Sequence, residues 1–189
     1  WHWQREAAKH VGMRAEVLEG TNPSRQGIIK NESRIWIVNY DILPCWMDFL
    51  KGIKPRLIVV DECHMLGNRR TRRTRATRYL CEKVPYILGL SGTPLTNRPA
   101  ELWPILNLIR PDLYPSFFSF AFTHCSPKRT PWGWEFKGAE KLDILHRDLL
   151  SSMMIRRRKE DVLSQLPPKL RSVILLDIER PQEYRKALQ

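Results

Sequence analysis

The fold is decided by LIVVDECH at Leu57–His64 and YILGLSGTP at Tyr86–Pro94. Each stretch begins as a short apolar run rich in branched residues and stops abruptly at a polar cluster, which is typical of a strand buried on both faces of a parallel sheet. In open α/β sheets, ligands bind in the crevice outside the carboxyl ends of such strands. Two adjacent strands of this kind would place both polar clusters at one edge of the sheet.

The first polar cluster suits metal-assisted hydrolysis. Asp61 can hold a hydrated Mg²⁺, and Glu62 can orient or deprotonate an attacking water, which is most of what phosphoryl transfer requires. His64 follows where a donor could report the state of a γ-phosphate to a neighbouring segment. The alternative is that both acids cap the next helix, since acids favour helix N-termini.

The order of the motifs resembles the first motor lobe of SWI/SNF-type DNA translocases, which are superfamily-two, helicase-like ATPases. The residues that carry the resemblance near the two strands are Val60–His64, Asn68, Leu90–Pro94, Asn97 and Glu101–Trp103. Those that carry it elsewhere are Ile37–Asp41, Met154–Arg157 and Leu166–Lys169. The resemblance implies a RecA-like α/β lobe that uses ATP and Mg²⁺ and moves on double-stranded DNA.

The resemblance also implies roles for single residues. Asp61 and Glu62 would be catalytic, with Asp61 holding Mg²⁺ through water. A second set would couple nucleotide state to the grip on DNA: His64, Ser91 and Thr93. A third set would bind DNA: Asn68, Asn97, Arg156 and Arg157. For Ser91 and Thr93 the alternative is a plain Ser/Thr turn.

A finer resemblance concerns Lys128–Glu135 and Asp161–Pro167, which are similar to the fork-remodelling, annealing-helicase subgroup. That subgroup rewinds DNA and acts at branched structures. Trp132 and Trp134 lie in the first of these segments beside basic residues. Such aromatics can stack on unpaired nucleotides or anchor an insert, and we favour the anchor because large aromatics dominate burial.

The sequence contains no G-x-x-x-x-G-K-[ST] phosphate loop, whose backbone and lysine hold the β- and γ-phosphates. Trp3–Glu6 looks like the tail of the motif that follows that loop in the family. We therefore expect an N-terminally truncated lobe, an internal piece of a longer or split motor that lacks the second lobe. The exposed part of its sheet would favour association, possibly with another copy.

Composition fits a basic nucleic-acid-binding protein. The 189 residues carry 32 basic and 20 acidic side chains, which gives a net charge of +12. Hydrophobic residues make up 42% of the chain, which is enough to fill one core. No apolar run is long enough to span a membrane and the start is not signal-like, so we expect an intracellular protein of a prokaryotic or virus-infected cytoplasm or of a nucleus. The four cysteines are scattered, which argues against a zinc site or a disulfide framework.

The domain organisation follows from the same patterns. We expect a mostly parallel sheet with helices on both faces over residues 1–110, a helical protrusion over 111–168, and a strand and helix leading towards the second lobe over 169–189. Leu142, Leu145, Leu149 and Met153 form the apolar stripe of the later protrusion helix.

Local signals predict the remaining elements of the first lobe. They give a helix over Gln4–Val11, strands over Ala15–Leu18 and Arg34–Tyr40, and a helix over Trp46–Leu50 capped by Asp41. In the family the corner at Asp41 touches DNA, but the plain cap is favoured. A helix over Ala100–Arg110 must kink or start late because of Pro104.

Six arginines without an acid occupy Arg69–Arg78. The spacing of Ala76, Tyr79 and Leu80 predicts the buried face of a helix, with Arg72 and Arg73 on the same stripe. A charge run is usually a solvated face. Beside a phosphate site on a basic protein, we favour contact of Arg72 and Arg73 with the DNA backbone.

Two functions of different classes fit the sequence. One is the first lobe of an ATP-driven duplex-DNA translocase, and the other is a basic DNA-binding module without ATPase activity.

Overall fold

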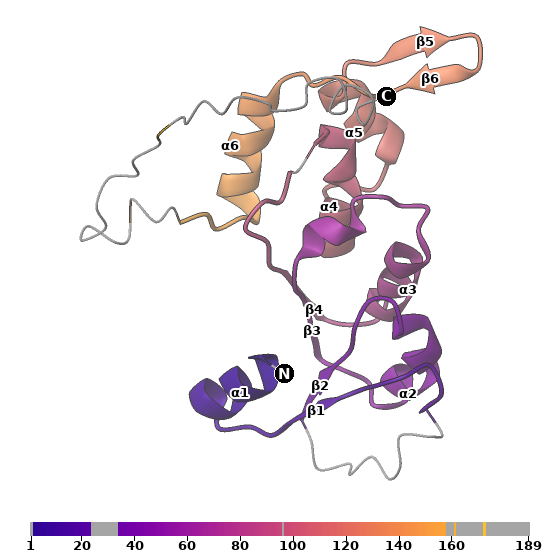
Figure 1. Cartoon of the computed structure of the whole chain (residues 1–189). Helices are drawn as coiled ribbons and strands as arrows, with labels where there is room; N and C mark the ends of the chain where they lie inside the picture. Colours follow the sequence, from indigo (N-terminus) through magenta and orange to yellow (C-terminus); the bar gives the residue numbers. More distant parts are fainter. Residues whose placement is uncertain (1, 24–33, 96, 158–160, 162–171, 173–189) are drawn as a thin grey trace, which may run out of the picture. The chain divides into compact units, whose positions relative to one another are not determined.

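The computed structural model describes residues 2–23, 34–95, 97–157, 161 and 172. The chain divides into two compact units, residues 1–146 and 147–189. Helices and strands are mixed along the first unit, which confirms an α/β fold (Figure 1).

The elements up to the arginine cluster are α1 (His2–Glu6), the π-helical turn η1 (Ala7–Val11), β1 (Ala15–Val17), β2 (Ile35–Ile37), the 3-10 turn η3 (Leu43–Trp46), α2 (Met47–Gly52), β3 (Leu57–Val60), the 3-10 turn η4 (Cys63–Leu66) and α3 (Arg72–Cys81). Those that follow are β4 (Tyr86–Gly89), the 3-10 turn η5 (Pro99–Glu101), α4 (Trp103–Ile109), α5 (Phe117–His124), β5 (Lys128–Thr130), β6 (Gly133–Glu135) and α6 (Leu142–Ser152).

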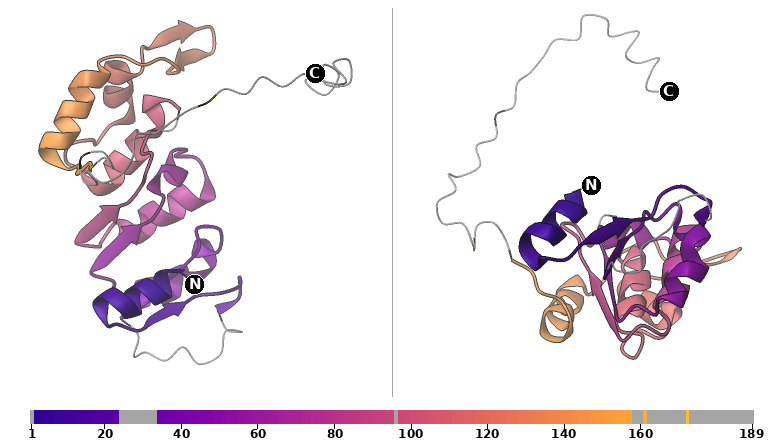
Figure 2. Two further views of the ribbon diagram at one scale, coloured as in Figure 1. Left: turned by 60° about the vertical axis from the view of Figure 1, so that its left-hand side comes forward. Right: turned by 90° about the horizontal axis from the view of Figure 1, so that it is seen from below.

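The two stretches that decide the fold are adjacent parallel strands. β3 pairs with β4 in parallel, with Leu57 opposite Tyr86 and Val60 opposite Gly89. β1 pairs with β2 in the same sense, and β5 and β6 form an antiparallel hairpin, so the described strands make three two-stranded sheets. In Figures 1 and 2, β1–β4 lie between α1 on one side and α2 and α3 on the other.

The prediction that β3 and β4 are buried on both faces is wrong for the described residues. Leu57 and Val59 on β3, and Tyr86 and Leu88 on β4, are exposed. Each strand therefore alternates between covered and open positions, as in a sheet that is packed on one face only. These four apolar side chains leave one face of the β3–β4 pair open to solvent.

The core of the first unit is built around Trp46, which is 0% exposed and packs with Leu18, Leu43, Leu50 and Leu80. Its indole N–H donates to the carbonyl oxygen of Gly20 at 3.0 Å. Gly20 has a φ of +69°, a conformation that glycine adopts without steric cost. The turn after β1 is therefore held to the core by the hydrogen bond between Trp46 and Gly20, and glycine is the residue that best adopts the backbone conformation of this turn.

The expected cap at Asp41 is wrong. The turn η3 begins after Ile42, without a side-chain cap. The side chain of Asn39 accepts a hydrogen bond from the backbone N–H of Asp41 instead. Asn39 thus forms the local turn that the sequence pattern assigned to its neighbour.

The expected buried stripe of α3 is confirmed for Leu80 and in part for Ala76, which packs half-buried against the core, but is wrong for Tyr79. The buried residues of this helix are Thr74, Thr77, Leu80 and Cys81, whereas Tyr79 is exposed beneath the ammonium group of Lys51. The Thr74 hydroxyl donates to the carbonyl of Leu66, and that of Thr77 to the carbonyl of Arg73. Satisfied hydroxyls let threonine occupy core positions that a hydrophobic pattern does not identify.

The helix around Pro104 starts late, as predicted, because α4 begins at Trp103 and places the proline in its first turn. The segment around Trp132 and Trp134 is a β-hairpin. Trp132 is 97% exposed at its turn, so it anchors nothing among the described residues. Trp134 packs edge-on against Phe122 with ring centroids 4.9 Å apart, as an anchor would.

The second unit contains the end of α6, which stops at Ser152, before the basic residues expected to end it. Within α6, Leu145 and Leu149 are buried but Leu142 is 41% exposed, so the predicted apolar stripe is confirmed only in part. The predicted strand Arg171–Ile178 and the helix from Glu179 lie outside the described residues, apart from position 172. Over the described ranges, none of the helices has the length and apolarity needed to cross a bilayer.

Candidate functional site

The two polar clusters meet at one edge of the β3–β4 pair. The backbone N–H of Leu90 donates to the carbonyl of Val60 at 2.9 Å, and that of Cys63 donates to the carbonyl of Leu90 at 2.9 Å. These bonds continue the parallel pairing past the last strand residues. We call the resulting group the strand-end site: Asp61, Glu62, His64, Ser91 and Thr93.

Asp61 is fixed by three groups. Its Oδ1 accepts from the backbone N–H of Glu62 at 2.9 Å, and its Oδ2 accepts from the indole N–H of Trp3 at 2.9 Å. The Tyr40 hydroxyl donates to the Asp61 carbonyl oxygen at 2.6 Å. Sequence reasoning missed Trp3 and Tyr40 as site residues, although both lie in segments that carry the family resemblance.

The same Tyr40 hydroxyl remains a donor throughout the ordinary pH range, because burial raises the pKa of this phenol. The carboxylate of Asp61 has about four lone-pair directions and uses two of them in the bonds above. Its remaining capacity faces solvent, since the residue is exposed.

Glu62 has a left-handed backbone, with φ +46° and ψ +49°. This conformation costs a non-glycine residue about 1–2 kcal/mol, and such strain gathers at functional sites. Glu62 precedes the turn η4 but makes no side-chain cap there. The capping alternative is therefore not supported for Glu62, and the strained backbone instead turns its carboxylate towards the next strand.

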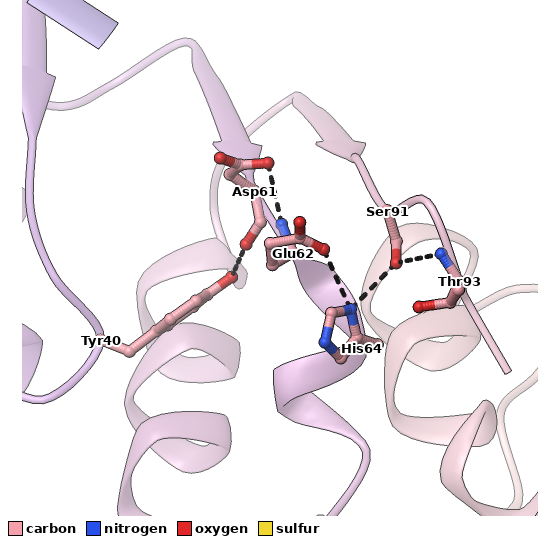
Figure 3. A network of polar contacts seen from close by, with 6 residues as sticks. All are labelled: Tyr40, Asp61, Glu62, His64, Ser91 and Thr93. Atoms are coloured by element: carbon pink, nitrogen blue, oxygen red, sulfur yellow. Dashed lines mark hydrogen bonds and ion pairs between the residues drawn. The ribbon is translucent and has the colours of Figure 1, made fainter. Parts of the chain in front are cut away.

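A polar chain links the ends of the two strands (Figure 3). The Nδ1 atom of His64 lies 3.1 Å from Oε2 of Glu62 and 3.0 Å from Oγ of Ser91. Ser91 Oγ in turn accepts from the backbone N–H of Thr93 at 3.1 Å. The Ser/Thr turn is thus present, and His64 ties it to the acidic cluster.

The donor set fits a hydrated Mg²⁺ rather than a fully protein-coordinated ion. Among the described residues, no group of three His, Cys, Asp or Glu side chains converges as a ligand cluster. Mg²⁺ keeps several waters and is usually held by one or two carboxylates together with substrate phosphates. Asp61, an exposed oxygen donor held in place by Trp3 and the backbone, matches that requirement.

Cys63 is a packing residue beneath this site. It is buried, and a Cβ added at Gly89 would come within 3.3 Å of its sulfur and 3.0 Å of Ile109 Cδ1. Glycine at the end of β4 therefore lets the two strand ends approach closely. Burial raises the pKa of the Cys63 thiol to about 11.

The thiols should differ sharply in reactivity. Burial raises the pKa of Cys81 to about 12 and that of Cys125 to about 11, whereas Cys45 is exposed. Because the thiolate is the nucleophile, a raised pKa keeps these thiols neutral and unreactive at pH 8. Titration of the folded chain with a disulfide reagent at pH 8 should modify Cys45 rapidly and the other three only on unfolding. Fast reaction of Cys63 would contradict this packing.

The residues predicted to contact DNA lie in both units, four of them in the first and two in the second. Asn68 is exposed, and its side-chain oxygen accepts from the N–H of Arg70 in the turn before α3. Arg72 is exposed and Arg73 half-buried, both in the first turn of α3, and Asn97 is exposed before η5. Arg156 and Arg157 are exposed after α6, in the second unit.

The chain matches the family model of the SNF2-related domain over residues 1–186. Among solved structures, the Sulfolobus solfataricus SWI2/SNF2 ATPase core in complex with dsDNA superposes with a TM-score of 0.65 at 26% identity. The superposition covers 85% of this chain and 32% of that one.

Curated relatives include the SWI/SNF-related matrix-associated actin-dependent regulator of chromatin subfamily A-like protein 1, which is 41% identical over 155 residues in Bos taurus and 39% over 147 residues in Xenopus tropicalis. The DNA annealing helicase and endonuclease ZRANB3 of Mus musculus is 32% identical over 154 residues. These matches cover 81%, 78% and 77% of this chain. The chain spans 16%, 16% and 14% of the length of these relatives.

Proposed function

The chain belongs to the SNF2-related domain family, and from this premise we propose that it is part of an ATP-dependent translocase that moves on double-stranded DNA. The observation that carries the proposal is the polar chain Glu62–His64–Ser91–Thr93, which joins the two strand ends. A site that only bound DNA would need positive charge, not a strained acidic turn coupled to a neighbouring strand.

The acids have distinct roles in this proposal. Glu62 orients the attacking water and accepts its proton, which is general-base catalysis. Asp61, held by Trp3 and by the backbone N–H of Glu62, positions a hydrated Mg²⁺. When bound, the ion neutralises charge on the transferring phosphoryl group.

Coupling runs through His64. Its Nδ1 can donate to Glu62 or to Ser91, which are almost equally distant. A change of charge beside Glu62, where the phosphate would lie, shifts the His64 hydrogen bond between Glu62 and Ser91. The change at Ser91 in turn alters the hydrogen bond that its Oγ accepts from the backbone N–H of Thr93. The segment that follows β4 would then report nucleotide state to DNA.

We propose that the DNA track is contacted by basic and amide side chains on several elements, all of them exposed except the half-buried Arg73. These residues are Asn68, Arg72, Arg73, Asn97, Arg156 and Arg157. Basic and amide side chains suit contact with a phosphate backbone, and the net charge of +12 raises the rate of encounter with a polyanion. The solved relative that binds dsDNA supports the same partner.

We also propose a domain organisation, an action on DNA and an association between copies of the chain. Residues 111–168 would form a protrusion on a RecA-like lobe whose strands join into one mostly parallel sheet, and 169–189 would lead to a second lobe. Similarity to a DNA annealing helicase supports an action in the annealing of DNA strands. The open side of β3 and β4 supports self-association.

A second candidate is a DNA-binding module that does not hydrolyse ATP. It is favoured by one observation, the lack of a G-x-x-x-x-G-K-[ST] loop in these 189 residues. The two candidates differ in whether the longest reading frame that contains this chain hydrolyses ATP. DNA-stimulated hydrolysis supports the translocase, and salt-sensitive DNA binding without hydrolysis supports the module.

Coupling through Ser91 can be tested separately. Ser91→Ala removes the oxygen that meets both His64 and the Thr93 N–H. One neutral hydrogen bond contributes about 0.5–1.5 kcal/mol, so the ratio of DNA-stimulated to unstimulated ATP hydrolysis should fall about twofold to tenfold. Steady-state ATPase assays with and without duplex DNA measure this ratio. Ser119→Ala, on the exposed side of α5, is the control, and an equal ratio in both variants would exclude the coupling path.

A further inference from the structure

Four arginines of the cluster line a recess that none of the strand-end residues lines. An open cleft of about 380 Å³ is bounded by Arg69, Arg70, Arg75, Arg78 and Trp103. A smaller cavity of about 50 Å³ shares three of these arginines and Trp103 with the cleft and is also lined by residues of η4, α3 and α4. We call both together the arginine recess.

The four arginines that line the recess favour the binding of an anion. Its four arginines are exposed, and among the described residues none of the four forms an ion pair with a carboxylate. Like charges gathered around one cleft repel each other, and a bound anion would relieve that repulsion. Arg69 is held in place because its guanidinium lies 4.1 Å from the centroid of the Phe117 ring.

Trp103 brings a buried hydrogen-bond donor to the recess. This residue is 5% exposed in the wall of the recess, and its indole N–H has no hydrogen-bond acceptor among the described residues. A buried donor without a partner costs about 1–3 kcal/mol. An oxygen atom of an anion in the smaller cavity would provide the missing acceptor.

We propose that the arginine recess binds backbone phosphates of nucleic acid, apart from the strand-end site. The recess is open, so a strand can pass across it. Trp103 is too buried to stack on a base, which leaves phosphate as the group recognised and predicts binding without sequence preference. This inference rests on the proposed function for its choice of DNA over other polyanions, and it adds a DNA-binding surface that sequence reasoning did not place.

The position of the recess differs from that predicted for the arginine cluster. Arg72 and Arg73, favoured from the sequence, do not line it, whereas Arg75 and Arg78 lie one turn apart on α3 and both do. Thr74 and Thr77 are buried, and the arginines that follow each of them, Arg75 and Arg78, line the smaller cavity together with residues of α4. The burial of Thr74 and Thr77 therefore fixes the rotation of α3 about its axis, and this rotation places Arg75 and Arg78 at the recess.

The test compares the salt dependence of duplex binding by the full 189-residue chain and its variants. Removing one arginine that binds a phosphate should lower the slope of log affinity against log salt by about 0.9, so Arg75→Gln with Arg78→Gln should lower it by up to about 2. Fluorescence anisotropy with a labelled duplex of mixed sequence gives the slope. Lys54→Gln with Lys83→Gln removes the same charge from exposed positions outside the recess and should change it much less.

Arg75→Lys with Arg78→Lys separates the removal of charge from damaged folding, since lysine keeps the charge and should restore the slope. Equal slopes for the recess and control variants would overturn the proposal. So would a recess variant that no longer binds a polyglutamate peptide while its DNA slope stays unchanged. Neither result bears on ATP hydrolysis, so failure of this inference is distinct from failure of the proposed function.

Discussion

Glu62→Gln should lower DNA-stimulated ATP hydrolysis by about 10²–10⁴-fold, the usual contribution of a positioned general base. Glutamine keeps the shape of the side chain but cannot accept the proton of the attacking water. The carboxylate it replaces lies 3.1 Å from His64 Nδ1 on a left-handed turn, so a change here affects both the base and the start of the polar chain.

The measurement is a steady-state ATPase assay on the longest reading frame that contains the chain, with nucleotide binding followed in parallel. Binding should persist, because Asp61 and not Glu62 is the residue proposed to hold the hydrated ion. Glu82→Gln, at an exposed carboxylate after α3, is the matched control and should hydrolyse ATP at the unmodified rate. Retention of full activity by Glu62→Gln would remove Glu62 from the mechanism.

Trp46→Ala should destabilise the first unit by about 3–5 kcal/mol, as large-to-small changes of buried aromatics do. Trp46 is 0% exposed, its indole N–H donates to Gly20, and its ring meets the Phe49 ring edge-on at 5.8 Å. The substitution leaves a cavity where the indole ring was and removes the hydrogen-bond donor of the Gly20 carbonyl beside it. A destabilisation of this size is a large part of the roughly 5–15 kcal/mol that stabilises a typical domain.

Urea unfolding followed by far-ultraviolet circular dichroism measures this change without depending on tryptophan fluorescence. Trp132→Ala is the matched control, because Trp132 is 97% exposed and its removal should change the free energy of unfolding by less than about 0.5 kcal/mol. Equal midpoints for the two variants would mean that the core is not organised around Trp46.

The elements that carry strong local signals could be predicted from the sequence. Leu57–Val60 and Tyr86–Gly89 are parallel neighbours, and the late start of α4 follows from Pro104. The convergence of Asp61, Glu62, His64 and Ser91 follows from the rule that parallel strands share a carboxyl edge. Their chemical roles come from the resemblance and remain predictions.

The failures have a common physical origin, which is that side-chain contacts across the fold are not periodic. Thr74 and Thr77 are buried because their hydroxyls find carbonyl acceptors, and this makes the arginine recess invisible to a hydrophobic pattern. Trp3 reaches Asp61 from 58 residues away. The left-handed backbone of Glu62 has no glycine to signal it.

The hairpin around Trp132 escapes sequence-based prediction for a local reason. Its strands are three residues each, too short for alternation to be recognised, and Gly133 with φ +122° lies beside the exposed tryptophan. The prediction that both tryptophans anchor an insert thus holds for Trp134 against Phe122 but not for Trp132.

The central claim is that ATP hydrolysis at the strand-end site drives movement along duplex DNA. It is tested most directly by displacement of a third strand from triplex DNA, using the longest reading frame that contains this chain. We predict displacement with ATP and none with a non-hydrolysable analogue or with Glu62→Gln. Duplex binding that weakens with rising salt, without any ATP-dependent displacement of the third strand, would contradict the claim. The protein would then be a DNA-binding module rather than a translocase.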